Sequence, residues 1–162
     1  MVSKVKSCGL AGIEGFIIDV EVDLSSGLPA FDIVGLPDAG VKESRERVKA
    51  AIKNCGFNMP IKRIVVNMAP ADVKKEGSVY DLPIAVALLI LSDQLKCADI
   101  GDYMLCGELS LDGAVRHING ALPMAVTARE HGIKNIILPL ANAKEAAVVD
   151  GINVFGARDL YE

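Results

Sequence analysis

The sequence predicts a single α/β domain with a mixed β-sheet and helices packed on it. Apolar and polar residues alternate with a period of two along much of the first 34 residues, and helical and strand-like segments then alternate to the end. The length of 162 residues suits one domain, and 51% hydrophobic with 23% charged residues is typical of a globular chain. Only 4% of the residues are aromatic and none is Trp, so aliphatic side chains must build the core. We therefore expect residues 1–162 to form one domain.

The N-terminal third predicts an antiparallel hairpin followed by a helix. Residues 4–24 are strand-like, Ser25–Gly27 supply turn residues, and residues 31–34 form the expected returning strand. Asp38 is a suitable N-cap for a helix that continues to Asn54. One face of this helix is apolar, so its charged residues must share another face.

The rest of the chain predicts three further helices and four strands. Strand 64–68 is apolar throughout and should be buried on both faces, and Asp81 should cap the helix that follows it. The last six residues, 157–162, resemble the start of another helix. The expected strands are 64–68, 103–109, 135–138 and 152–155, and the expected helices are 82–92, 120–130 and 142–149.

Composition excludes several classes of protein. The longest apolar run, residues 82–91, is far shorter than the roughly 18–20 residues that cross a bilayer. Glu14 and Asp19 interrupt the apolar N-terminal stretch, so it lacks the core of a signal peptide. The four cysteines show no paired spacing, which favours reduced thiols in a cytoplasmic protein. They are Cys8, Cys55, Cys97 and Cys106.

Charge is distributed unevenly along the chain, although the net charge is only −4. Residues 42–75 carry nine basic and three acidic side chains, a net charge of +6, whereas the other residues carry −10. Helical spacing places several of the basic residues in one row, and such asymmetry can focus a local positive field. A solvated helix face that only keeps the domain soluble is the alternative. The candidate phosphate-binding residues are Lys42, Arg45, Lys49, Lys53, Lys62 and Arg63.

Motifs for other chemistry are missing from the sequence. It contains no phosphate-binding loop of the ATPase type, and the glycines of residues 9–15 fit bulges and turns better than a dinucleotide site. The only histidines are His117 and His131, and no two cysteines are spaced as zinc ligands. We therefore expect no cofactor, no metal and no catalytic residue in this chain.

Three loop strings combine Gly, Pro and charge between apolar elements, and function tends to lie in such loops. They are residues 35–48, residues 67–85, which include Lys75-Glu-Gly-x-x-Tyr-Asp-Leu-Pro-Ile-Ala85, and residues 107–123, which begin Gly107-Glu-Leu-Ser-Leu-Asp-Gly113. The role of Lys74–Gly77 is open between a turn that packs under Asp81 and an interface with another module.

Together these strings resemble the N-terminal domain of the ComM/YifB family, the magnesium-chelatase-like AAA+ proteins of bacteria. The resemblance covers essentially the whole chain. It implies the ribosomal-protein-S5-domain-2-like fold, which the Lon protease domain shares. It also implies that an AAA+ module, with its ATP and Mg²⁺, lies C-terminal to this region in the parent protein and is absent from this chain.

The Lon-like kinship raises a peptidase hypothesis that the residues themselves can test. Lon-type peptidases use a Ser nucleophile and a Lys base, and alignment on the shared strings places Val79 and Leu122 at those two positions. Neither hydrocarbon side chain can attack a carbonyl or accept a proton. Ser78 lies one position away, but a shift of one residue does not supply the base. We therefore expect no peptidase activity.

The resemblance favours a non-catalytic accessory domain of a hexameric AAA+ motor that remodels DNA during recombination and natural transformation. The basic residues would contact phosphates or help to assemble the ring, with the parent's own AAA+ module and neighbouring subunits as partners and no membrane involved. A purely protein–protein oligomerisation module is an alternative, because it would use the same charges. A magnesium-chelatase-type subunit or a degenerate Lon-like peptidase is a further alternative. The sequence does not separate DNA binding from oligomerisation.

Overall fold

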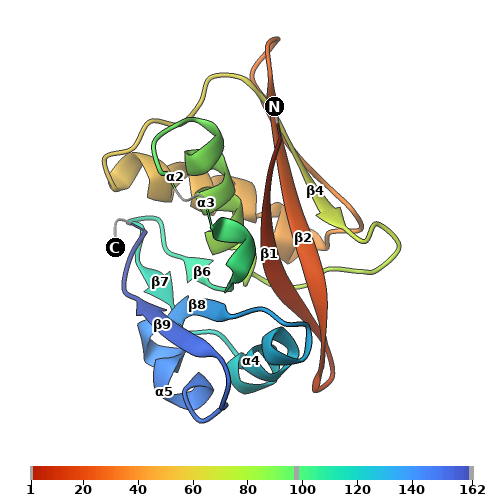
Figure 1. The fold of residues 1–162 in the computed structure, drawn as a ribbon. Helices are drawn as coiled ribbons and strands as arrows, with labels where there is room; N and C mark the ends of the chain where they lie inside the picture. Colours follow the sequence, from red (N-terminus) through yellow and green to blue (C-terminus); the bar gives the residue numbers. More distant parts are fainter. Residues whose placement is uncertain (1, 97–98, 161–162) are drawn as a thin grey trace.

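The fold is built around one large mixed sheet, seen in a computed structural model that describes residues 2–96 and 99–160. Within those residues the sheet has seven strands in the order β3-β4-β2-β1-β5-β8-β9, and β6 and β7 form a separate ribbon. Figure 1 shows the long β1–β2 hairpin along one side of the molecule and the C-terminal strands β8 and β9 below α2 and α3. The strands are β1 (Val2–Ala11), β2 (Glu14–Ser25), β3 (Ala30–Val34), β4 (Arg63–Ala69), β5 (Tyr103–Leu105), β6 (Glu108–Leu109), β7 (Val115–Arg116), β8 (Asn135–Pro139) and β9 (Asn153–Ala157).

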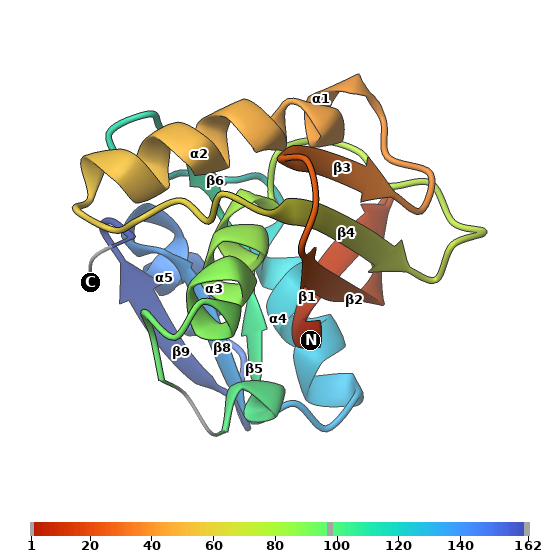
Figure 2. The same cartoon turned by 90° about the horizontal axis from the view of Figure 1, so that it is seen from above.

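Helices cover both faces of the sheet. α3 packs on β1 and β2, and α2 packs on the outer side of α3 (Figures 1 and 2). α4 packs on the other face of β1 and β2 and also contacts β8. The fold class predicted from the sequence, mixed α/β, is therefore confirmed. The helices are α1 (Ala39–Lys42), α2 (Ser44–Asn54), α3 (Asp81–Leu91), α4 (Ala121–Glu130) and α5 (Ala143–Ala146), with short 3₁₀ turns η1 (Ile100–Asp102) and η2 (Leu140–Asn142).

Two apolar cores result from this arrangement, one on each face. Alternate residues of β1 point to opposite cores, so that Val5 joins the core under α3 and Cys8 joins the core under α4. α3 is buried along nearly its whole length, because it lies between α2 and the sheet. None of the helices in the described part of the chain is long and apolar enough to cross a membrane.

The predicted hairpin was wrong in its choice of strands. β2 pairs antiparallel with β1 through a turn at Gly12 and Ile13, and β3 pairs parallel with β4 instead of returning along β2. The turn residues after β2 do reverse the chain, but β4 lies between β2 and β3 because its alternating buried residues match both neighbours. The same alternation corrects the expectation that β4 is buried on both faces: only every second residue is fully buried.

Several element boundaries also differ from the sequence-based expectation. The helix predicted to end at Asn54 is divided at Glu43 into α1 and α2, and the strand predicted over residues 103–109 is divided into β5 and β6. The helix predicted over residues 142–149 is reduced to α5. Residues 158–160 do not begin a helix: the Leu160 amide donates to the Gly113 carbonyl at 2.7 Å, and this bond ties the segment to the β6–β7 turn. The rest of that predicted helix lies outside the described residues.

Cys8, Cys55 and Cys106 form no disulfide within the described residues, and Cys97 lies outside that range. Cys8 and Cys106 are fully buried between the sheet and α4. Burial raises the pKa of the Cys8 thiol to about 11 and that of the Cys106 thiol to about 12.

We expect these two thiols to resist alkylation in the folded protein at pH 8, since they are inaccessible and hold little thiolate. Cys55 is only partly buried and should react with iodoacetamide before either of them. Peptide mass spectrometry over a time course checks this, with a sample in urea as the reference for full reaction. Equal rates at Cys8 and Cys55 in the native protein would contradict the buried environment described here.

Candidate nucleic-acid interface

The candidate basic residues are positioned by α1 and α2, and the local sequence explains where these helices begin and end. The Asp38 carboxylate accepts the Val41 amide at 2.7 Å, as predicted for the N-cap. Gly56, at φ +84°, follows the C-cap and stops α2. Val41 and Val48 are fully buried against the core, so the basic side chains occupy the other sides of the two helices.

Three of the six candidate residues converge on one groove. Lys42 at the end of α1, Arg45 in α2 and Arg63 at the start of β4 line a hollow of about 390 Å³ above β3 and β4. Arg63 joins the helical residues because β4 pairs in parallel with β3, with Arg63 opposite Ala30. Asp32 of β3 lines the same groove, so its lining carries three positive charges and one negative charge. We call this hollow the basic groove.

Arg45 is held in place by the backbone around it. Its Nε donates to the Lys42 carbonyl at 3.0 Å and its Nη1 donates to the Phe31 carbonyl at 3.4 Å, on β3, the edge strand of the sheet. These bonds use two of its five N–H donors and leave the others for a ligand. The described residues supply no ion-pair or hydrogen-bond partner to the side chains of Lys42 and Arg63, whose charges face solvent.

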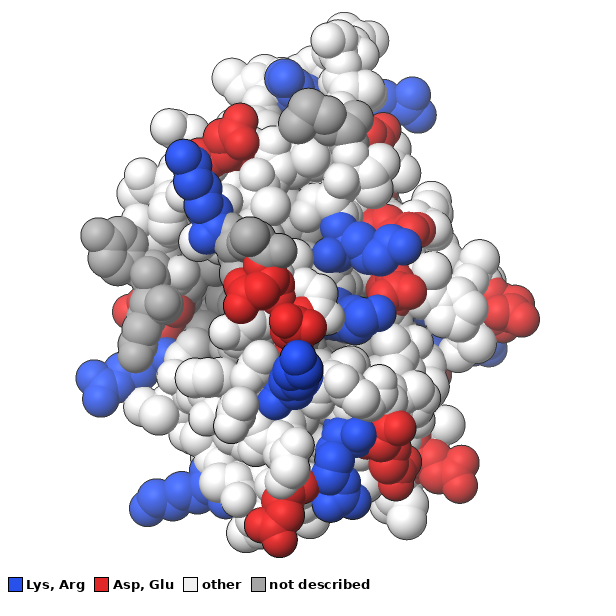
Figure 3. All heavy atoms as spheres, viewed as in Figure 1, with Lys and Arg blue, Asp and Glu red and all other residues white. Residues whose placement is uncertain are grey.

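The other three candidates lie near the groove but do not line it. Lys49 has its ammonium 3.8 Å from the Glu46 carboxylate and 6.0 Å from the centre of the Phe31 ring. Lys53 and Lys62 are exposed, at the last turn of α2 and just before β4. The structure therefore divides the six candidate residues into three that line the groove and three that flank it. On the face of the molecule shown in Figure 3, blue and red side chains are interspersed rather than gathered by sign.

Two of the nine basic residues of the segment point inward, which sequence reasoning missed. The first is Lys75, which is fully buried, with its ammonium donating to the carbonyls of Gly35 and Pro70. Burial lowers the pKa of the Lys75 ammonium, and the nearby charge of Asp72 opposes this shift. No sequence signal distinguishes Lys75 from its exposed neighbour Lys74.

Backbone hydrogen bonds of Lys75 show where the Lys74–Gly77 loop packs. The Lys75 amide donates to the Leu36 carbonyl at 3.0 Å, and the Asp38 amide donates to the Lys75 carbonyl at 2.9 Å. The Gly77 amide donates to the second carboxylate oxygen of Asp38 at 3.3 Å. The loop therefore packs under the junction of β3 and α1, next to Asp38, and not under Asp81 as one of the two hypotheses proposed.

The second inward residue is Arg47, which pairs with Asp81. Asp81 is fully buried and is the first residue of α3, not its cap, since Tyr80 occupies the N-cap position. Its carboxylate accepts from Arg47 Nε at 2.6 Å, from Ser44 Oγ at 2.5 Å and from the Leu109 amide at 3.0 Å. These bonds join α2, α3 and β6. Arg47 and Lys75 are thus structural, and neither is available to a phosphate.

The two positions that correspond to the Lon-type dyad hold hydrocarbon side chains in different surroundings. Val79 is partly buried and packs against both cores, and Leu122, 38% exposed, lies at the start of α4. Leu122 lines a separate hollow with Ile13 and Val126. No group of three or more His, Cys, Asp or Glu side chains in the described part of the chain is arranged to hold a metal ion.

Comparison with known proteins places this chain in a family. The model of the family described as subunit ChlI of Mg-chelatase matches residues 20–142, most of the chain. This chain belongs to the ChlI family. The resemblance recognised in the three loop strings is thereby confirmed.

Relatives of this ChlI-family chain include YifB of Escherichia coli, 46% identical over 149 residues, and competence protein ComM of Haemophilus influenzae, 40% identical over 151 residues. A Lon protease of Mycolicibacterium smegmatis is more distant, at 26% identity over 167 residues. The matches cover 92%, 93% and 95% of this chain but only 29%, 30% and 21% of those proteins. The chain therefore spans less than a third of the length of YifB and of ComM.

Proposed function

We propose that this ChlI-family chain is a non-catalytic accessory domain of a ComM-type motor that remodels DNA, and that the basic groove contacts the DNA backbone. The kinship to a competence protein supports a role in DNA uptake or recombination. The rest of that protein would supply an AAA+ module that binds ATP and Mg²⁺ and assembles as a hexameric ring in the cytoplasm. This chain would guide DNA while hydrolysis occurs in the other module.

The observation that carries the proposal is the convergence of Lys42, Arg45 and Arg63. They come from three elements, α1, α2 and β4, yet all three residues line one groove at the edge of the sheet. Lys and Arg are the side chains that bind phosphates, and contacts to phosphates alone carry no sequence preference. Only 4% of the residues are aromatic, which does not favour a platform for stacking single-stranded bases.

An oligomerisation module is the second candidate, because the same groove could receive an acidic surface of a neighbouring copy. The negative charge outside residues 42–75 favours this alternative, since head-to-tail contacts between unlike surfaces are what a closed ring requires. The same variants test both candidates when DNA binding and self-association are measured on one sample.

The test is charge reversal in the groove, with Lys42→Glu and Arg63→Glu combined. Lys49 is left unchanged, because its ammonium lies 3.8 Å from the Glu46 carboxylate and it does not line the groove. We expect the wild-type chain to bind duplex or forked DNA weakly and the variant to lose about tenfold or more at low salt. The slope of log affinity against log salt should fall by about 2, since two phosphate contacts are lost.

The matched control is Lys134→Glu with Lys144→Glu, which changes the net charge equally at exposed positions just before β8 and in α5. Fluorescence anisotropy measures DNA affinity, and light scattering on the same samples measures self-association. Equal weakening by both double variants would show a nonspecific effect of net charge. A groove variant that binds DNA normally but no longer self-associates would favour the oligomerisation module instead.

A further inference from the structure

The C-terminal half of the sheet has an apolar face that residues 2–96 and 99–160 cover only in part. β1, β5, β8 and β9 run parallel to one another, and parallel sheets are normally covered on both faces. α4 packs against β8 and α5 packs against β9 on the side of the core that contains Cys8. On the opposite face, α3 packs on β1 and β2. In Figure 2 β9 is the outermost of the C-terminal strands, beyond β5 and β8.

A row of three side chains shows where the cover ends. Leu105, Ile137 and Phe155 are register neighbours on β5, β8 and β9, and all three face the groove on the α3 side. Leu105 is 1% exposed, Ile137 is half-buried and Phe155 is 47% exposed. Exposure therefore rises along the row as it leaves α3. The Tyr103 ring packs beside Phe155 with 6.0 Å between ring centres.

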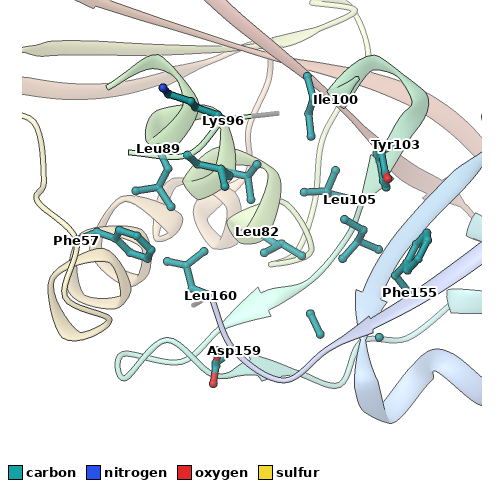
Figure 4. A pocket seen from close by; sticks show the side chains of 15 residues that line it. Phe57, Leu82, Leu89, Lys96, Ile100, Tyr103, Leu105, Phe155, Asp159 and Leu160 are labelled. Carbon is teal, nitrogen blue, oxygen red and sulfur yellow. The ribbon is translucent and has the colours of Figure 1, made fainter. Parts of the chain in front are cut away.

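The space beside this row is a groove of about 530 Å³, which we call the apolar groove. Leu82, Val86 and Leu89 of α3 form one wall, and Phe155 with the rest of its row forms the other (Figure 4). Lys96 and Asp159 also line it, and Figure 4 shows their charged ends directed away from its apolar centre. Such a groove, apolar inside with charges at its border, is the form that receives one face of an amphipathic helix.

We propose that the apolar groove is the docking site of an amphipathic helix that belongs to the additional polypeptide of the longer ChlI-family proteins. YifB and ComM contain more than twice as many residues outside the matched segment as within it, so they have ample polypeptide to supply such a helix. The helix would complete the second layer over β8 and β9 and would cover Phe155. Its border would carry a carboxylate opposite Lys96. This proposal does not depend on DNA binding.

The first experiment uses a photo-cross-linker in place of the exposed ring, Phe155→p-benzoylphenylalanine. It is made in this chain alone and in a chimera in which this chain replaces the matching segment of Escherichia coli YifB. The control position is Val148, 71% exposed beyond α5, with the same substitution. We expect the cross-linker at position 155 of the chimera to link to a helix of the YifB part of the same polypeptide. The cross-linker at position 148 should not form this link. Mass spectrometry identifies the linked peptide.

Two outcomes overturn the proposal. Cross-linked dimers of the isolated chain through position 155 would mean that a second copy fills the groove. Equal yields at positions 155 and 148 of a folded chimera would mean that nothing docks there.

A second measurement needs only the chain itself, so it holds even if the chimera does not fold. An open apolar groove should bind 1-anilinonaphthalene-8-sulfonate, and Phe155→Asp should abolish most of the fluorescence gain while Val148→Asp should not. Circular dichroism checks that both variants stay folded. Unchanged dye binding in the Phe155→Asp variant would show that the groove is not an accessible apolar site.

Discussion

Replacement of Asp81 by Asn should lower the free energy of unfolding by about 3–5 kcal/mol, the usual cost of removing one partner from a buried ion pair. The Asp81 side chain is fully buried, and the Arg47 side chain that pairs with it is only 18% exposed. The variant would leave the guanidinium without its counter-charge and would turn an amide N–H₂ toward donors that need an acceptor. Because the carboxylate joins α2, α3 and β6, we expect the variant to destabilise the whole domain and not only one helix, so that a single unfolding transition moves to lower urea concentration. Urea denaturation followed by circular dichroism measures it.

Glu43→Gln is the matched control, since Glu43 pairs with the same guanidinium at 3.5 Å but is 68% exposed. Exposed pairs contribute little, so this variant should lose about 0.5 kcal/mol or less. Similar losses for the two variants would show that burial of Asp81 does not set the strength of its pairing. A double-mutant cycle with Arg47→Ala then isolates the coupling between Arg47 and Asp81.

Replacement of Gly35 by Ala should cost about 3 kcal/mol or more. Gly35 has φ +102°, a conformation that costs other residues about 1–2 kcal/mol. In addition, a Cβ at this position would overlap the backbone carbonyl of Met68, which β4 holds in place. The backbone would have to shift, and the Gly35 carbonyl would move away from the Lys75 ammonium, which it accepts at 2.7 Å. The clash and the lost bond add to the conformational cost.

Gly12→Ala separates these effects, because Gly12 also has positive φ, +66°, but no atom lies within 4 Å of the Cβ that would be added. We expect it to cost about 1 kcal/mol. Thermal and urea unfolding of both variants give the comparison. Equal costs would mean that the close approach of Gly35 to Met68 contributes nothing.

Local pattern was sufficient to predict where most elements lie, and it failed where the choice of neighbour decides the structure. Asp38 caps its helix as expected, because capping depends on residues a few positions apart. The pairing of β3 with β4 could not be inferred from the turn after β2, since a chain reversal does not specify which strand lies alongside. Asp81 stands before an apolar run, where a cap would be expected. In the structure it is the first residue of α3, and its carboxylate accepts a hydrogen bond from Arg47, 34 positions earlier.

The candidate site shows the same limit. Helical spacing correctly predicted that Lys42 and Arg45 lie on one side, but Arg63 reaches the groove through sheet pairing, which spacing does not encode. Lys75 carries the same charge as Lys74 and is nevertheless inside the protein. Side-chain type alone therefore overestimates the positive charge that a ligand meets, because it does not show which lysines satisfy backbone carbonyls.

The basic groove and the apolar groove lie in opposite halves of the sheet, which meet where β1 pairs with β5. β5 has three residues, and Ser7 reinforces this seam by donating its hydroxyl to the Leu105 carbonyl at 2.7 Å. A load applied to one half must pass through this narrow strip and the helices that bridge it. The seam is therefore the natural place for the domain to bend, and its stiffness sets how far a displacement at the apolar groove reaches the basic groove.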